Sequence, residues 1–197
     1  MLEIDKSLNL VIPITRNDET KIYIHATPIR YEFFEKYWKV LGKTYAEFTH
    51  HGFDSLTGPS LAAICLKDVA ENTARTQSTN WWQGDDGVGG KTGLMAEIRR
   101  LSNVLTLSGV GEWATTPLQV AFDQNHITEK ERRKAENLLV FFTVVSLVAP
   151  EADGPKLVKG MAYVYELQTT LLNSTEFANS LKTSTTGGSS GKKPPAS

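Results

Sequence analysis

The stretch TEKERRKAENLLVFFTVVSLVA, Thr128–Ala149, decides the fold of this chain. It opens with the pattern of a capping box, in which Thr128 and Glu131 each satisfy a backbone N–H in the first turn of a helix. Pro150 ends the helix, because proline cannot continue the helical hydrogen bonds. The second half of the stretch is apolar on nearly every side, and a helix with that pattern is buried. We therefore expect the longest and central helix of the protein here.

The first 26 residues have the pattern of a β-hairpin. Residues 8–14 are apolar and β-branched, residues 15–20 are typical of a turn, and residues 21–26 alternate between polar and apolar. Pro13 has no N–H for a neighbouring strand, so the first strand is expected to lie at an edge or to be interrupted there. Two strands are barely stable alone. The hairpin must therefore pack on helices or gain strands from a neighbouring subunit.

The rest of the body reads as a series of helices. Four prolines directly follow a residue that can cap a helix, and proline is favoured at the first helical position; they are Pro28, Pro59, Pro117 and Pro155. We expect helices at 28–41, 44–49, 59–75, 92–107, 117–123 and 155–174. Their apolar faces are expected to bury Tyr37, Trp38, Leu61, Ile64, Leu66 and Val69. The predicted fold class is mainly α (α+β), a single helical domain over residues 1–180 with an N-terminal β-hairpin.

The end of the chain has a different composition. From Leu181 it reads LKTSTTGGSSGKKPPAS, and no large apolar residue follows Leu181. Such a segment cannot bury enough surface to offset the entropy cost of ordering it. We expect residues 181–197 to form a flexible Ser/Thr/Gly/Lys/Pro tail that the body does not need for folding.

Charge and hydropathy exclude several classes of protein. Residues 1–180 carry 18 basic and 22 acidic groups, which argues against nucleic acid as a partner. The basic run at 130–134 is expected to be the solvated start of a helix. The longest apolar run, Leu138–Ala149, is too short to span a bilayer, and the first residues do not form a signal peptide. We expect a soluble protein in a reducing compartment, with no membrane partner.

The glycine-rich stretch GDDGVGGKT, residues 84–92, resembles a phosphate-binding loop. That loop needs glycine, four residues, and then Gly-Lys-Ser/Thr. Asp85 stands where the first glycine is required, so the spacing fails by one residue. Two aspartates would also repel phosphate. The pattern favours a mobile loop that leads into a helix, and we expect no nucleotide or other cofactor.

Other candidate groups lack the spacing that chemistry requires. Cys65 is the only cysteine and lies among apolar residues, which favours a buried side chain over a nucleophile. No pair of histidines has metal-ligand spacing; the four are His25, His50, His51 and His126. No Gly-x-Ser-x-Gly elbow or calcium loop is present. We therefore expect no catalytic residue, no metal site and no enzyme activity.

Two adjacent tryptophans form the one unusual candidate site. Trp81 and Trp82 stand beside the glycine-rich stretch, and adjacent side chains cannot easily both point inward. Tryptophan is enriched at binding hot spots. Trp81 and Trp82 are therefore candidate partner-binding residues, and packing of the two rings under the loop is an equal alternative.

In outline, the whole chain resembles the tail assembly chaperones of long-tailed (lambda-like) bacteriophages. The likeness lies in a mainly helical body of this size, an N-terminal hairpin and a Ser/Thr/Gly tail. Gly191-Lys192-Lys193 also fits the slippery codons at which members of this family undergo ribosomal frameshifting into a longer product. The family has no catalytic residues to carry over to this chain.

The resemblance implies a function in tail assembly. Such a chaperone coats the long helical tape measure protein in the host cytoplasm, recruits tail tube subunits, and is absent from the mature virion. Several copies along one client are expected. Two alternatives remain at this stage: a structural tail or head–tail connector protein, and a small enzyme for which the sequence shows no site.

Overall fold

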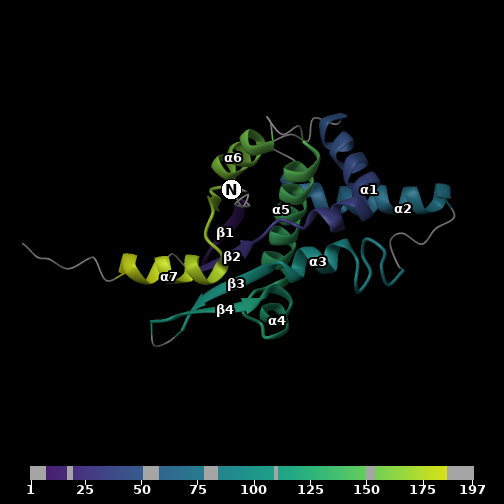
Figure 1. Ribbon diagram of the computed structural model, residues 1–197. Coiled ribbons are helices and arrows are strands. Elements are labelled where there is room, and N and C mark those ends of the chain that lie inside the picture. Colours follow the sequence, from purple (N-terminus) through teal and green to yellow (C-terminus); the bar gives the residue numbers. More distant parts are fainter. Residues whose placement is uncertain are drawn as a thin grey trace, which may run out of the picture.

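The computed structural model describes residues 8–16, 20–50, 58–77, 84–108, 111–149 and 154–185. These residues form helices and one antiparallel sheet (Figure 1). The helices are α1 (Tyr31–His50), α2 (Gly58–Gln77), α3 (Leu94–Arg100), α4 (Leu118–Asp123), α5 (Glu129–Val148), α6 (Gly154–Val164) and α7 (Ser174–Thr185). The strands are β1 (Asn9–Arg16), β2 (Thr20–Ala26), β3 (Ser102–Leu107), β4 (Trp113–Pro117) and β5 (Gln168–Thr170). The fold class is mixed α+β, which confirms the prediction in part, because the described strands form a five-stranded sheet and not a hairpin alone.

The N-terminal hairpin is the centre of a larger sheet. The strand order is β4-β3-β2-β1-β5, and every pair is antiparallel. The hairpin thus gains additional strands from its own chain. β5 pairs with β1 only at Asn9–Val11. Beyond Val11 β1 is an edge, which suits Pro13, as the sequence predicted.

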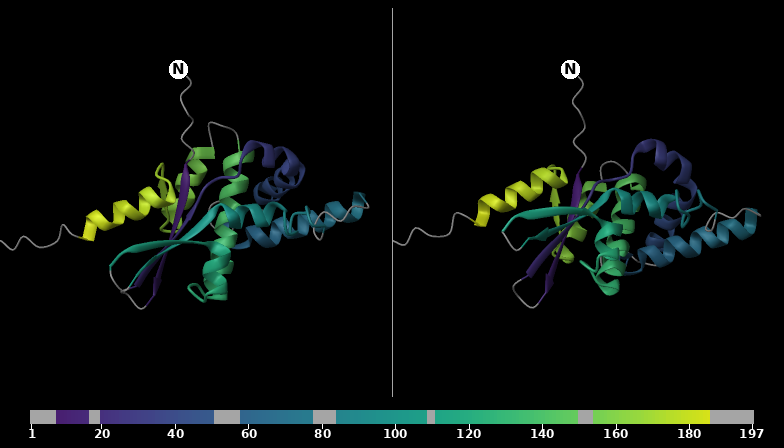
Figure 2. Two further views of the ribbon diagram at one scale, coloured as in Figure 1. Left: turned by 60° about the horizontal axis from the view of Figure 1, so that its bottom comes forward. Right: turned by 90° about the horizontal axis from the view of Figure 1, so that it is seen from below.

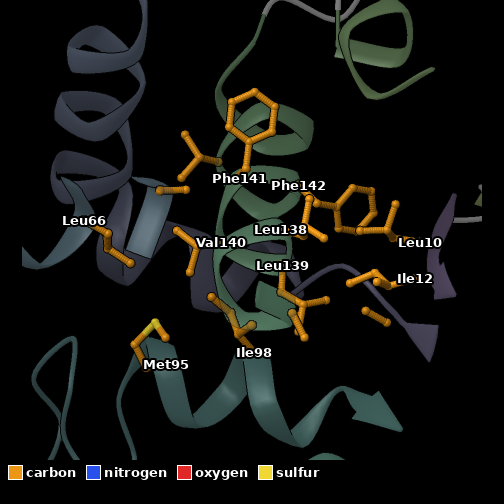
Figure 3. Packing of buried hydrophobic residues seen from close by; sticks show 14 of the residues in the cluster. Leu10, Ile12, Leu66, Met95, Ile98, Leu138, Leu139, Val140, Phe141 and Phe142 are labelled. Carbon is orange, nitrogen blue, oxygen red and sulfur yellow. The ribbon is translucent and has the colours of Figure 1, made fainter. Parts of the chain in front are cut away.

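Helix α5 is the central helix of the domain, as the sequence predicted. Thr128 caps it, and Thr128 and Glu131 form the reciprocal bonds of a capping box. The buried side chains of its second half contact α1, α2, α3 and the sheet (Figure 3). Phe141 is 4% exposed, and its ring centroid lies 5.2 Å from that of Phe48 on α1. The core therefore surrounds α5 on several sides.

The two faces of the sheet are covered differently. One face carries Ile12, Ile24 and Val104 into the large core around α5. The opposite face carries Val11, Tyr23 and Leu105 into a small cluster with Phe177 and Ala178 of α7. Figure 2 shows the strands between α7 and the bulk of the helices. Helix α7 therefore covers the second face of the sheet by itself among the described elements.

The helix predicted at 92–107 is wrong over its second half. Helix α3 ends at Arg100, and strand β3 follows directly. Ser102 turns the chain, because its hydroxyl donates to the Ile98 carbonyl at 2.7 Å. Val104 and Leu105 then point to opposite faces of the sheet and are both buried. A strand that is buried on both faces has no polar alternation, so its apolar run resembled a helix.

The helix predicted at 155–174 is also wrong. Helix α6 ends at Val164, and Glu166 adopts a left-handed conformation with φ 55°. The Leu167 N–H bonds to the Ala162 carbonyl and the Glu166 N–H to the Tyr163 carbonyl, which is the pattern of a Schellman motif. Strand β5 and helix α7 follow. A non-glycine residue in this position gives little signal in a sequence.

Helix α7 continues past Leu181, the residue at which the sequence predicted the start of a tail. Leu181–Thr185 belongs to α7, and Leu181 packs against the small cluster on the second sheet face. Residues 186–197 lie outside the described part of the chain. Helix α1 is likewise longer than predicted, since it continues through Gly42 to His50.

Candidate functional site

Large apolar side chains on the outer surfaces of α1 and α2 are the main candidate for a binding site. Tyr31 is 67% exposed, Trp38 is 54% exposed and Ile64 is 64% exposed. Surface apolar residues are common singly, but gathered ones mark interaction sites. We call Tyr31, Trp38, Leu61 and Ile64 the exposed helical residues.

The outward face of α1 carries two of these side chains. Tyr31 and Trp38 are seven residues apart, so they lie two turns apart on one side of the helix. The Tyr31 ring lies 5.8 Å from that of Phe34, and the Lys39 ammonium lies 5.7 Å from the Trp38 ring. The prediction that Trp38 belongs to the core is therefore wrong. Tyr37 and Phe48 supply the buried aromatic rings of this helix.

Helix α2 also turns apolar side chains outward. Leu61 and Ile64 are three residues apart and share a side of the helix, and both are exposed. The prediction that Leu61 and Ile64 point inward is wrong. Leu66 and Val69 face the core as expected. Periodicity alone could not separate the two sets, because apolar residues occur on both sides of this helix.

An apolar cavity lies next to the first turn of α1. Its volume is about 500 Å³, and its lining comes from the start of α1, the C-terminal half of α5 and the start of α6. Tyr31 stands at its border with Ile29, Leu147 and Val158. A cavity of this kind can accept an apolar side chain of a partner.

Further exposed apolar side chains lie where α6 leads into β5 and α7. Tyr163 is 88% exposed, and Val164, Leu171 and Leu172 are exposed as well. β5 is an outer strand of the sheet, so one of its sides has no neighbour among the described strands. These features add a second region at which a partner could contact the protein.

The cysteine has the properties of a structural residue. Cys65 is half-buried on α2. Burial raises the pKa of its thiol to about 11, with smaller contributions from Glu47 and Asp68. A thiol with a raised pKa is a poor nucleophile at neutral pH.

The histidines are dispersed. His25 is buried, its Nε2 lies 2.9 Å from the Leu172 carbonyl oxygen, and burial lowers its pKa. His50 and His126 are exposed at other places, and His51 lies outside the described residues. Within the described ranges, no three residues of the types His, Cys, Asp and Glu gather at a possible metal site.

The basic run at the start of α5 is partly neutralised. Arg132 bonds to Glu129 and Glu136, at 2.9 and 2.8 Å, and Arg133 bonds to Glu129 at 2.8 Å. Two of its four cations are therefore balanced within the helix, and the other two, Lys130 and Lys134, are exposed, which agrees with the expected solvated face.

The tryptophan pair cannot be placed relative to these surfaces. Trp81 and Trp82 lie outside the described residues, so their assignment as partner-binding residues stays a prediction. The glycine-rich stretch beside them is described from Gly84 onward. Its Asp86 contacts α1: the Tyr37 hydroxyl donates to the Asp86 carbonyl, and Lys36 pairs with the Asp86 carboxylate at 3.3 Å.

Comparison with known proteins assigns no family to this chain, so its function is inferred from the fold and the side chains. No protein-family model, curated protein or solved structure matches this chain. Across the described ranges, no helix combines the length and the apolar character that crossing a membrane requires.

Proposed function

We propose that this protein is a phage tail assembly chaperone that binds the tape measure protein and helps to recruit tail tube subunits. The observation that carries the proposal is the exposure of Tyr31, Trp38 and Ile64 on the outside of α1 and α2. Large apolar side chains are costly to leave in water, so helices that expose several of them suit a partner that covers them.

The exposed side chains indicate which kind of client surface would bind to them. A tape measure exposes apolar helix faces until the tail tube encloses it. Aromatic and aliphatic side chains on helices, with an apolar cavity beside Tyr31, suit the side chains of such a face. A long client offers many short binding sites of this kind, which suits the binding of several copies of a small protein along it. In this proposal the protein works in the host cytoplasm and leaves before the virion matures.

Coexpression with the client tests the proposal. The client protein should stay soluble when this protein is present and precipitate when it is absent, and added ATP should change nothing. Replacing Trp38 and Ile64 together by serine should return most of the client to the pellet. Leu107→Ser is the matched control, because Leu107 is exposed but lies on β3.

Two outcomes would overturn the proposal. If the client is equally soluble without this protein, the protein does not act as its chaperone. A protein that remains in purified virions in stoichiometric amounts is instead a structural tail or head–tail connector subunit. The thermal midpoint of each variant, which should match the wild type, shows that a loss of binding is not a loss of fold.

A further inference from the structure

A second cavity lies on a different part of the molecule from the exposed helical residues. Its volume is about 490 Å³, and it lies between the glycine-rich loop, the outer side of α3 and the start of α4. Three of its lining side chains are cationic and none is acidic; the cationic ones are Lys91, Arg99 and Arg100. We call this hollow the cationic cavity.

The two arginines are held in place by carboxylates. Arg99 donates from Nε to Glu136 at 2.8 Å. Arg100 donates from Nε and Nη2 to the two oxygens of Glu97, at 2.6 and 2.7 Å. Both guanidinium groups are thereby oriented. Within the described residues, the two terminal nitrogens of Arg99 and Nη1 of Arg100 have no acceptor, so they remain available to an anion.

The glycine-rich loop is fixed by its own backbone. The Thr92 N–H and hydroxyl both donate to the Asp85 carbonyl at 2.8 Å. A Cβ atom on Gly90 would lie 2.0 Å from the Gly84 carbonyl oxygen, so only glycine fits that position. The sequence predicted a mobile loop at this point, and these contacts instead hold residues 84–92 in one shape. A rigid loop loses little entropy when it binds a ligand.

Three groups of this loop remain unpaired at the cavity. In the part of the chain that the structure describes, the Gly89 and Lys91 amides have no hydrogen-bond acceptor, and the Lys91 ammonium has no acidic partner. Unpaired amides and cations around one hollow are the usual surroundings of a bound oxyanion.

We propose that the cationic cavity binds the oxyanion group, phosphate or carboxylate, of a small ligand. The cavity exceeds the size of a single phosphate, so the ligand carries further atoms, and Ala96 and Pro117 offer them apolar contacts. This site differs from a nucleotide-binding loop, because the required glycine is replaced by Asp85. It is independent of the client-binding function.

NMR titration tests the proposal and distinguishes the two anions. Inorganic phosphate and succinate are added separately to the labelled full chain at constant ionic strength, with chloride as the reference. The Gly89 and Lys91 amide signals should shift and saturate at millimolar concentrations. Tighter binding of phosphate assigns a phosphate ligand, and tighter binding of succinate assigns a carboxylate. Absence of saturation by both up to about 50 mM, an affinity too weak for a specific site, overturns the proposal.

Three variants locate the binding groups. Lys91→Gln and Arg100→Gln should each weaken binding of the preferred anion by about tenfold, since each removes a charge-assisted hydrogen bond. Glu97→Gln should strengthen binding, because it removes the carboxylate that competes for Arg100. General damage to the fold would not produce opposite signs in neighbouring residues. Lys159→Gln, on α6 and away from the cavity, should bind like the wild type. Equal binding by Lys91→Gln and the wild type would show that the site is not here.

Discussion

Glu131 joins the first strand of the protein to its central helix. Arg16, the last residue of β1, donates from Nε to Oε1 of Glu131 at 2.7 Å. The other oxygen of the same carboxylate accepts the Thr128 N–H at 2.7 Å and so completes the cap of α5. One carboxylate therefore holds the helix start and attaches it to the sheet.

The free energy of unfolding should fall in acid because of this carboxylate. The hydrogen bonds from Arg16 lower the pKa of Glu131 to about 2, from an ordinary value of 4.5. A lowered folded-state pKa gives stability that is present above 4.5 and is lost as the pH falls toward 2. Glu131→Gln should cost about 1–2 kcal/mol at pH 7, as measured by urea unfolding.

The pH dependence separates this effect from simple loss of a cap. The wild type and Glu131→Gln should converge in stability as the pH approaches 2, because the wild-type carboxylate is then protonated. Glu112→Gln is the control, since Glu112 lies on an exposed turn, and it should match the wild type throughout. A gap between Glu131→Gln and the wild type that stays constant from pH 7 to pH 2 would contradict the prediction.

Phe141→Ala should be among the most destabilising single changes. The side chain is buried in the middle of α5 against Phe48. Removing it leaves a cavity, and such a change costs about 3–5 kcal/mol. Thermal and chemical unfolding measure the cost, with Val148→Ala at the half-buried end of the helix as the milder comparison. A cost below about 1 kcal/mol would mean that the core can collapse around the missing ring.

Two glycines should respond to alanine with opposite signs. Gly90→Ala places a methyl group against the Gly84 carbonyl and should destabilise the protein by at least about 1–3 kcal/mol. Gly42→Ala lies within α1, where a Cβ meets no atom within 4 Å. It should stabilise the protein by about 0.5–1 kcal/mol, because alanine favours a helix. Equal unfolding midpoints for the two variants would contradict the close packing around Gly90.

Glu166→Gly should stabilise the protein. Glu166 ends α6 with φ 55°, a conformation that glycine adopts without steric cost. The change also removes an acid from the negative end of the helix. We expect a gain of up to about 1 kcal/mol in thermal unfolding. Asn125→Gly, at the equivalent position after α4 with φ 58°, should gain less, because asparagine tolerates this conformation.

The parts of the fold that the sequence predicted are those with a local signal. The capping box at Thr128 and the all-apolar run after it placed α5, and alternation around residues 21–26 placed the hairpin. The strands β3, β4 and β5 escaped prediction. β3 and β5 pair with the strands of the N-terminal hairpin, which are distant from them in sequence. Val104 is in a strand because it pairs with Thr116 and Ile24, and no local pattern carries that information.

The candidate surfaces were harder to predict than the fold. The apolar character of Trp38 and Ile64 suggested the core as much as that of Tyr37 and Leu66 did, and only the packed structure separates the exposed pair from the buried pair. The cationic cavity joins residues 89–91 to Arg99, Arg100 and Pro117. The sequence offered the glycine-rich stretch alone, without the arginines that face it. Site residues from separate elements meet only after the chain folds.

The pairing of β1 with β5 has a consequence for synthesis on the ribosome. β1 is made first among the strands and β5 last, yet Asn9 lies opposite Thr170 in the finished sheet. During translation this pairing cannot form until residues 168–170 have been synthesised. Long-range strand pairing of this kind forms late and leaves a strand edge exposed meanwhile. The edge of β1 near Asn9 is therefore open to pairing with other chains until β5 has been made.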